Sequence, residues 1–283
     1  MKILLAGASG QLGRQICARN ESNAITPLSH QDLDITSLAA VREAVSVFRP
    51  DIILNAAAFN DVDRAEAEPD IAFLGNALGP RNLALAAAET GAALLHVSTD
   101  YVFDGGQTTP YHEYHEPRPL SNYGRSKLAG EVAVRELNPR HYIVRTAWVY
   151  EPRGKNFPRT LHSLALKGQE LKVVSDVKGS PTSAAHLARA ILTLIETGAY
   201  GTHHLAGAGD GASWFDLATE MFRVLGMNVA ISPVPASAFP RPAPRPPYSV
   251  LRTIQQPRMV LPSWQEGIAE FAREITTQSG DTQ

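Results

Sequence analysis

A strand, a glycine-rich turn and a helix at the start of the chain constrain the fold more than any other feature. The apolar run over residues 3–6 predicts a strand, and Gly7, Gly10 and Gly13 follow it before a predicted helix that reaches Arg19. The first glycine allows a tight turn, the second lets the backbone approach a pyrophosphate, and the third lets helix and strand pack closely. The helix N-terminus then meets the phosphates, so the pattern predicts a nucleotide-binding turn.

Strands and helices keep alternating through the first half of the chain. Strands are predicted over residues 25–28, 51–55, 92–97 and 141–149, with one helix capped by Thr36 that ends at 48 and another over 70–90 that Gly91 ends. Alternation of this kind specifies a parallel sheet with helices on both faces, joined by right-handed crossovers. We therefore expect an α/β fold, a doubly wound parallel sheet of the Rossmann type.

The second half is less regular. Helices are predicted over residues 183–197, 213–225 and 264–275, and a strand near 203–205. Seven prolines between 233 and 247 exclude a regular helix or central strand there, and predict an ordered loop, with a linker as the alternative. The polar tail from Thr276 is expected to be frayed.

Charge and cysteine content narrow the class of partner. A formal net charge of -2 does not indicate the strongly basic surface that binds nucleic acid or an anionic membrane. The longest apolar runs, such as residues 52–59, are too short to span a bilayer. Cys17 is the single cysteine, so no disulfide forms within the chain, and the histidine spacings predict no metal site. A small-molecule partner and a cytoplasmic location are expected.

Tyr123 and Lys127 are candidates for proton transfer. On a helix, a spacing of four puts both on one face, where the ammonium can lower the phenol pKa and hold it as a proton donor to a carbonyl oxygen. Hydride arriving at a ketone creates an alkoxide that needs such a donor and a second hydrogen-bond partner, for which Thr99 is the candidate. The alternatives are a helix-surface pair for the first two and a turn or cap residue for Thr99.

The chain resembles the short-chain dehydrogenase/reductase superfamily, because three motifs follow one another in the order that this superfamily uses. They are the glycine triplet, Asn55-Ala56-Ala57-Ala58 and Tyr123-x-x-x-Lys127. Residues 96–105 (HVSTDYVFDG) and 145–150 (RTAWVY) resemble the dTDP-4-dehydrorhamnose reductase family more closely, and further matches at 32–35, 62–66, 179–182 and 245–249 extend the likeness over nearly the whole chain. The resemblance implies hydride transfer from NADPH or NADH to the C4 carbonyl of dTDP-4-dehydro-6-deoxy-L-mannose. It also implies an NAD(P)-binding Rossmann domain at 1–150 and a mainly substrate-binding part at 151–283, interleaved with it.

The family's site residues carry over to matching positions. The resemblance implies contacts of Gly10, Gln11 and Leu12 with the pyrophosphate, of Asp34 and Ile35 with the adenine, and of Ala58 and Asn60 with the ribose or linker. Lys127 would also bind the nicotinamide ribose. The cofactor set is completed by Gly7, Ser9, Ala56, Ala57 and Tyr123, and the substrate set is Thr99, Asp100 and Trp148. Without the resemblance, Asp34 is interpreted as a cap of the helix that follows, Asp100 as a helix cap or turn residue, and Trp148 as a core aromatic.

Two positions depart from the family pattern. Gln15 replaces a glutamate that helps to build a magnesium-linked dimer, and Arg252 stands where the family often has an aspartate. A neutral amide is a poor magnesium ligand, so that dimer is doubtful and we expect a monomer or a weak homodimer. After the second predicted strand, Ser29 and His30 include neither an acid that favours NADH nor an arginine that favours NADPH.

Other functions stay open. A dehydratase of this superfamily carries Thr-Asp-Glu, and Tyr101 after Thr99 and Asp100 argues against it. A nucleotide-sugar epimerase is excluded less firmly, and a reductase of another nucleotide sugar is the foremost alternative. A non-catalytic, NADP-binding regulatory subunit resembling the methionine adenosyltransferase β subunit would not need Thr99, Tyr123 and Lys127 together.

Overall fold

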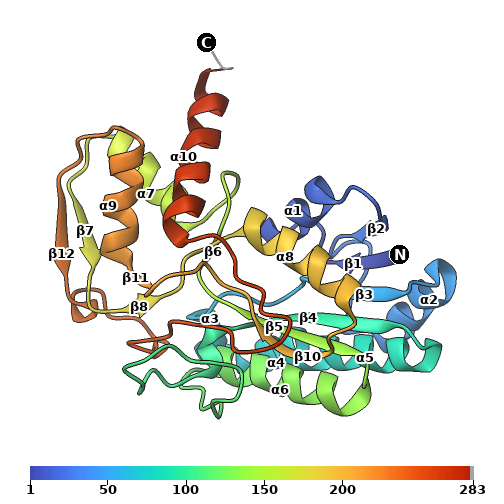
Figure 1. Cartoon of the computed structure of the whole chain (residues 1–283). Helices are drawn as coiled ribbons and strands as arrows, with labels where there is room; N and C mark the ends of the chain where they lie inside the picture. Colours follow the sequence, from blue (N-terminus) through green and yellow to red (C-terminus); the bar gives the residue numbers. More distant parts are fainter. Residues whose placement is uncertain (281–283) are drawn as a thin grey trace.

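The computed structural model describes residues 1–280, and its central element is a six-stranded parallel sheet with the order β10-β5-β4-β3-β1-β2 (Figure 1). Its strands are β1 (Lys2–Ala6), β2 (Ala24–Leu28), β3 (Ile52–Asn55), β4 (Ala93–Thr99), β5 (His141–Thr146) and β10 (Gly201–His204). Along β1, Ile3 and Leu5 pack into the core on one face, and Leu4 and Ala6 into the core on the other. Burial on both faces is typical of parallel sheets, and the predicted α/β fold is confirmed.

Helices cover both faces of the sheet. On one face lie α1 (Gln11–Arg19) and α8 (Ala184–Thr197), drawn above the sheet in Figure 1. On the other lie α2 (Leu38–Phe48), α5 (Gly79–Thr90) and α6 (Asn122–Leu137). Short helical segments fill the connections, namely α3 (Arg64–Ala67), α4 (Pro69–Phe73), the π-helical turn η1 (Leu74–Leu78) and the 3-10 turn η2 (Asp100–Val102).

The C-terminal part adds a second, smaller body beside the sheet (Figure 1). Its core joins α7 (Phe157–Leu166), α9 (Trp214–Val224) and α10 (Trp264–Gly280) to the parallel pair β7 (Leu171–Val174) and β12 (Ile231–Val234). Two further strand pairs connect it to the main body, β6 (Val149–Tyr150) with β9 (Thr182–Ser183) and β8 (Lys178–Gly179) with β11 (Ala212–Ser213). β10 and α8 lie beyond residue 150 yet belong to the central layers.

Several element boundaries differ from the sequence prediction. Ser37, not Thr36, caps α2, because the Ser37 hydroxyl accepts from the Ala40 amide while Thr36 donates to Asp34. The predicted strand over 141–149 breaks after Thr146, and the predicted helix over 70–90 contains the π-helical turn η1.

The proline-rich region and the tail also differ in part. Pro233 lies in β12, which pairs only with β7, and the 3-10 turn η3 (Ala236–Ala238) follows it before the irregular chain resumes. β7 was not predicted. Thr276 lies inside α10, which continues to Gly280, so the helix extends past the point where fraying was expected; residues 281–283 lie outside the described range.

Candidate active site

A cavity of about 290 Å³ opens where β1, β3, β4 and β5 end, at their carboxyl ends. This edge is where open parallel α/β sheets bind ligands. Its walls come from the glycine turn, the loop after β3, the ends of β4 and β5, and α6; they are Gly10, Gln11, Leu12, Ala56, Ala58, Asn60, Val97, Ser98, Thr99, Asp100, Tyr123, Lys127, Thr146, Ala147, Trp148 and Val149.

The glycine turn leaves a helix N-terminus facing this cavity. Gly7 has φ +81°, and a Cβ there would lie 2.6 Å from the Ala57 nitrogen, so the turn packs directly on the loop after β3. A Cβ on Gly13 would lie 2.3 Å from the Gly7 carbonyl oxygen. Gly10 is the N-cap of α1, and no side chain caps the helix. The first amides of α1 are therefore available to an anion.

The loop after β3 is held by two buried asparagines. Asn55 accepts from the Ala57 amide at 3.1 Å and contacts His96 Nδ1 at 3.0 Å. Asn76 holds Phe59 by both its backbone groups and donates to the Ser126 hydroxyl at 3.0 Å. These contacts fix the loop that carries Ala56, Ala58 and Asn60 against β4 and α6.

Tyr123, Lys127 and Thr99 converge on the cavity. Ser121 caps α6 through the Gly124 amide, and Tyr123 and Lys127 lie one turn apart on the helix face toward β4. The Lys127 ammonium donates to the Val97 carbonyl at 2.6 Å. Thr99, at the end of β4, forms a side-chain hydrogen bond with Tyr123 and donates to Asp100 Oδ1 at 3.0 Å.

Burial decides the protonation of the two α6 groups. It raises the pKa of Tyr123 to about 12, with Asp100 adding to the rise and the hydrogen bond to Thr99 opposing it. It lowers the pKa of Lys127 to about 8, against the attraction of Glu131. The expected lowering of the Tyr123 pKa by Lys127 is not seen: burial, Thr99 and Asp100 set this pKa, and the Lys127 ammonium instead donates to the Val97 carbonyl. The phenol is thus held protonated by desolvation.

Asp100 accepts hydrogen bonds from its neighbour Thr99 and from Ser249, which is distant in the sequence. Ser249, which sequence reasoning assigned no role, donates to Asp100 Oδ2 at 2.5 Å. Burial raises the pKa of Asp100 to about 6, while the hydrogen bonds from Ser249 and Thr99 lower it. The match of residues 245–249 to the family was the only sequence signal for this contact.

Trp148 forms the border between this cavity and a second one. It has φ +47°, rare for a bulky residue, and its indole stacks on Trp214 with ring centroids 3.5 Å apart and 4° between planes. A Cβ on Gly179 would lie 2.5 Å from the Trp148 ring. This arrangement explains why the predicted strand breaks after Thr146. Trp214 was not among the predicted site residues.

The second cavity, of about 700 Å³, lies between the two bodies and is partly closed by residues 236–247, which we call the strap. Arg245 on the strap forms two hydrogen bonds with Asp63, at 3.0 and 2.9 Å, and Asp63 also accepts from the Ala243 amide. The cavity has cationic and aromatic walls, among them Lys172, Arg241, Arg245, Tyr101, Phe157, Trp214 and Phe239. The strap is thus an ordered loop tied to the main body.

The structure brings together most predicted site residues. The cavity lining contains the predicted residues Gly10, Gln11, Leu12, Ala56, Ala58, Asn60, Thr99, Asp100, Tyr123, Lys127 and Trp148. Gly7, Ser9 and Ala57 belong to the adjoining turns. Asp34 is exposed and accepts from the amide and hydroxyl of Thr36; Ser37 caps α2, so the alternative helix-cap role of Asp34 is wrong. Ile35 is a buried core residue.

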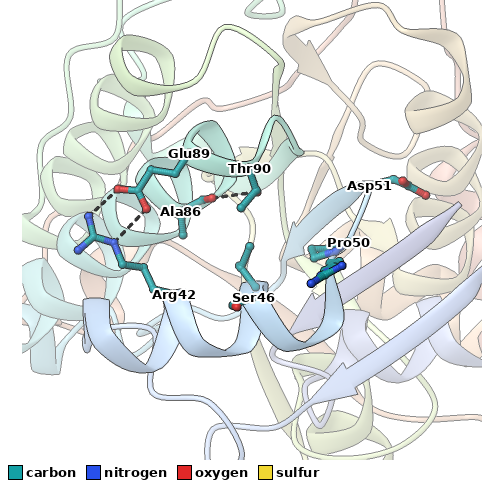
Figure 2. Close-up of a pocket in the computed structure, with 9 residues that line it drawn as sticks. Arg42, Ser46, Pro50, Asp51, Ala86, Glu89 and Thr90 are labelled. Carbon is teal, nitrogen blue, oxygen red and sulfur yellow. Dashed lines mark hydrogen bonds and ion pairs between the residues drawn. The ribbon is translucent and has the colours of Figure 1, made fainter.

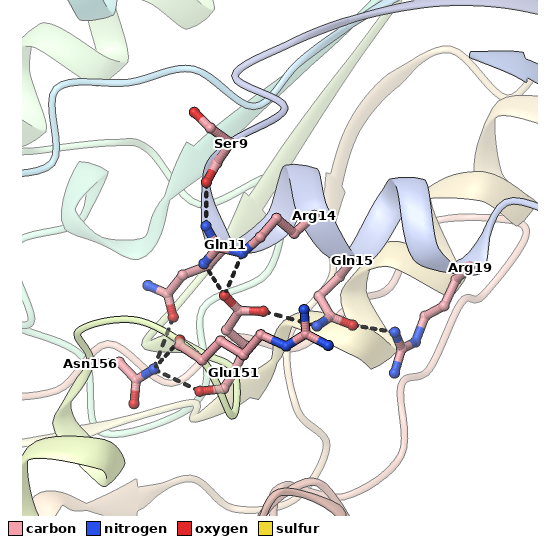
Figure 3. Close-up of polar contacts among 8 residues, drawn as sticks. Ser9, Gln11, Arg14, Gln15, Arg19, Glu151 and Asn156 are labelled. Carbon is pink, nitrogen blue, oxygen red and sulfur yellow. Dashed lines mark hydrogen bonds and ion pairs between the residues drawn. The ribbon is translucent and has the colours of Figure 1, made fainter. Parts of the chain in front are cut away.

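Gln15 is engaged within the chain (Figure 3). Its amide nitrogen donates to Glu151 Oε2 at 2.9 Å, and its oxygen accepts from Arg19. Glu151, whose side chain is 1% exposed, also pairs with Arg14, which reaches the Ser9 carbonyl. The cluster ties the start of α1 to the loop before α7.

A further surface cavity lies between α2 and α5, away from this chemistry (Figure 2). Its residues Pro50 and Asp51 precede β3, so it sits at the opposite edge of the sheet. Arg42 and Glu89 pair across it. Within residues 1–280, no helix is long and apolar enough to cross a membrane, and no cluster of three His, Cys, Asp or Glu side chains could hold a metal ion.

Comparison with known proteins gives matches over the whole length. The family model described as RmlD substrate binding domain matches residues 1–277. The dTDP-4-dehydrorhamnose reductase of Salmonella typhimurium is 40% identical over 298 residues, covering 98% of this chain and 99% of that protein. A Streptomyces antibioticus protein named "Probable dTDP-4,6-dihydroxy-2-methyloxan-3-one 4-ketoreductase" is 42% identical over 256 residues, covering 89% of this chain and 86% of that protein. The crystal structure of Bacillus anthracis dTDP-4-dehydrorhamnose reductase in complex with NADP is similar, with a TM-score of 0.94, 40% identity and coverage of 96% and 99%.

Proposed function

The chain belongs to the RmlD substrate binding domain family, and from that premise we propose that it reduces dTDP-4-dehydrorhamnose to dTDP-L-rhamnose with NADPH or NADH. The observation that carries the proposal is the convergence of Thr99, Tyr123 and Lys127 on one cavity, beside the uncapped N-terminus of α1. A donor, a hydrogen-bond partner and a cation at a carbonyl are what ketone reduction requires.

In this proposal, Thr99 and Tyr123 hold the C4 carbonyl oxygen of the sugar. When bound, the reduced nicotinamide supplies the hydride. As negative charge develops on the oxygen, the protonated Tyr123 phenol donates its proton to it, while the Thr99 hydroxyl turns its single hydrogen from Asp100 to the same oxygen. Lys127 binds the ribose and provides positive charge near the phenol. Before the sugar binds, Asp100 accepts this hydrogen from Thr99, and it also accepts a hydrogen bond from Ser249.

The residues at the glycine turn fit a dinucleotide. The free amides at the start of α1 and the absence of a side chain on Gly10 leave room for a pyrophosphate at the cavity wall. At the end of β2, Ser29 donates to Asp32 by both its amide and its hydroxyl. We propose that neither NADPH nor NADH is strongly preferred, since no arginine or acid occupies the position just after β2.

We assign the nucleotide part of the substrate to the second cavity. Lys172 offers positive charge to a diphosphate, Arg241 and Arg245 are held at the same wall by Asp63, and the aromatic side chains offer stacking surface to a base. In this arrangement the sugar reaches from one cavity to the other, past the stacked rings of Trp148 and Trp214.

The direct test is turnover of purified protein. Enzymatically prepared dTDP-4-dehydrorhamnose is mixed with NADPH or with NADH, loss of reduced-nicotinamide absorbance is followed, and the product is identified by NMR. We expect dTDP-L-rhamnose and equimolar cofactor oxidation. Cofactor binding without turnover on any 4-keto sugar would contradict the proposal and favour the regulatory-subunit alternative.

A second candidate is a reductase of another 4-keto nucleotide sugar. It is favoured by the Streptomyces antibioticus relative, which is as similar in identity as the Salmonella enzyme although its name specifies a different sugar. A panel of dTDP-4-keto sugars that differ at C2 and C3 separates the two, because kcat/KM should be highest for the true substrate.

We predict an alkaline limit to activity set by Lys127. Its pKa of about 8 means that the ammonium loses its charge as the pH rises past that value, whereas Tyr123 keeps its proton to about 12. The kcat/KM for NADPH, measured at saturating sugar, should therefore fall above about pH 8. If kcat/KM for NADPH stayed constant up to about pH 10, the charge of Lys127 would have no role in the reaction.

Asp63→Asn is expected to weaken sugar-nucleotide binding. The carboxylate pairs with Arg245, and its pKa is held low mainly by that hydrogen bond, so the amide should loosen the strap. Because the pair is partly exposed, we expect KM for the sugar to rise about fivefold, with kcat and NADPH affinity little changed. Glu116→Gln, which removes the exposed Glu116–Arg118 pair, is the matched control. Equal changes of KM in the two variants would show that Asp63 has no part in substrate binding.

We also propose a cytoplasmic monomer or weak homodimer that is not linked by magnesium. The absence of a magnesium link is supported by the hydrogen bonds of Gln15, whose amide nitrogen donates to Glu151 and whose amide oxygen accepts from Arg19. The amide is neutral, and its oxygen is already hydrogen-bonded within the chain, so it is a poor ligand for a magnesium ion.

A further inference from the structure

Behind Lys127, the interior holds a buried ion pair that the proposed reaction has not used. Glu131 lies one helical turn after Lys127 on α6, and its side chain is 0% exposed. Arg145 on β5 binds it with two hydrogen bonds, Nε to Oε1 at 2.9 Å and Nη2 to Oε2 at 2.7 Å. A buried carboxylate and guanidinium are expensive to desolvate, and replacing such pairs by apolar residues is often stabilising. Stability alone does not account for this pair.

The pair is joined to the strand that carries the catalytic threonine. The Ser98 hydroxyl donates to Glu131 Oε1 at 2.6 Å, and the preceding residue, Val97, accepts from the Lys127 ammonium at 2.6 Å. Two successive residues of β4, just before Thr99, are therefore tied to two successive turns of α6. Both Val97 and Ser98 line the active-site cavity.

We propose that Glu131 is a positioning residue for Lys127: it fixes α6 on β4 through Ser98 and holds a buried negative charge one helical turn from the ammonium. This inference rests on the proposed reductase function. Arg145 holds the carboxylate in place, and its register partner on β4 is Ser98. A spacing of four between Lys127 and Glu131 is the sequence signal that could have identified it.

Other ionisable groups near Lys127 do not supply this charge. His96 on β4 is buried, and burial together with Lys127 holds its pKa well below the usual value, so it stays neutral. Tyr123 on α6 is protonated, and Asp100 at the end of β4 accepts from Ser249 and Thr99 and is not among the groups that shift the pKa of Lys127. At the start of α6, Glu66 of α3 accepts from the Asn122 amide, and Arg135 on α6 reaches Glu131 at 3.7 Å from a side chain 45% exposed. Burial lowers the pKa of Lys127, and Glu131 is the group that raises it.

The test is the pH dependence of NADPH binding in Glu131→Gln, which keeps the shape of the side chain and removes its charge. The dissociation constant is measured by titration calorimetry from about pH 6 to about pH 10, without sugar. We expect the alkaline weakening of binding to begin roughly one pH unit lower than in the wild type. Glu136→Gln, which removes the same charge from an exposed position of α6 and leaves the buried carboxylate in place, should leave the profile unchanged.

Two further variants keep the test decisive if Glu131→Gln does not fold. Glu131→Gln combined with Arg145→Gln leaves no unpaired buried charge and should shift the profile in the same direction by a smaller amount. Glu131→Asp keeps the charge and should leave the profile near the wild-type position. A folded variant lacking the carboxylate, with a wild-type pH profile, overturns the inference. Since no sugar is present, failure of the proposed reductase activity would not affect this readout.

Discussion

Replacing Tyr123 by phenylalanine is expected to reduce kcat by about 10²- to 10⁴-fold, the range that a positioned general acid contributes. The phenol is buried, hydrogen-bonded to Thr99 and protonated at neutral pH, so the variant removes the proton donor while leaving the ring and its edge-on contact with Tyr101. The affinity for NADPH should stay close to that of the wild type. The measurement is kcat from steady-state turnover, with NADPH binding followed separately by calorimetry.

Tyr111→Phe is the matched control for that change. Its buried ring carries a hydroxyl that donates to Asp104 at 2.9 Å, outside both cavities. Removing that hydroxyl should leave kcat within about twofold of the wild type. If Tyr123→Phe lost less than tenfold in kcat, or no more than Tyr111→Phe, another group would have to be the proton donor.

Gly13→Ala is expected to weaken NADPH binding by about 100-fold, equivalent to about 2.8 kcal/mol. A Cβ at this position would lie 2.3 Å from the Gly7 carbonyl oxygen and 2.7 Å from the Ala8 Cα, and both are backbone atoms that cannot turn aside. The glycine turn would have to move, taking the amides at the start of α1 out of place for a pyrophosphate. The dissociation constant and the thermal unfolding temperature should be measured together, because overpacking also costs stability.

Gly106→Ala is the control for the added methyl group. The nearest atom to a Cβ there is the Asp104 carboxylate oxygen, at 3.4 Å, an ordinary contact in a loop outside the cavity. NADPH affinity should be unchanged. A Gly13→Ala protein that is folded and binds NADPH as tightly as the wild type would show that the glycine turn does not hold the cofactor.

The main sheet could be predicted from the sequence because its signals are local. The apolar run before Gly7, the helix-ending Gly91 and the helix through Tyr123 and Lys127 each appear within a few residues, and the structure has these elements. β7 was missed, because Leu171–Val174 is a short strand with an exposed lysine in a two-stranded pair, where alternation is too brief to recognise. Trp148 was assigned to a strand, because its positive φ depends on stacking with a residue far along the chain.

The candidate site could be predicted only as far as its motifs reach. The glycine turn, Thr99, Tyr123 and Lys127 were identified from spacing and resemblance, and the structure places them around one cavity. Ser249, Trp214 and Arg245 were not assigned roles, because folding brings them to the site from more than 60 residues away. Lys127 was expected to lower the Tyr123 pKa, but burial, which a spacing of four residues does not reveal, raises that pKa to about 12.

The central claim is that this cavity transfers a hydride from the cofactor to C4 of a dTDP-sugar, and isotope transfer tests it most directly. The protein is incubated with dTDP-4-dehydrorhamnose and NADPH that carries deuterium at C4 of the nicotinamide, and the product is examined by NMR and mass spectrometry. We predict dTDP-L-rhamnose with deuterium at sugar C4 alone. A product without deuterium, as from an epimerase that returns the sugar's own hydride, or no product from a protein that still binds NADPH, would contradict the account.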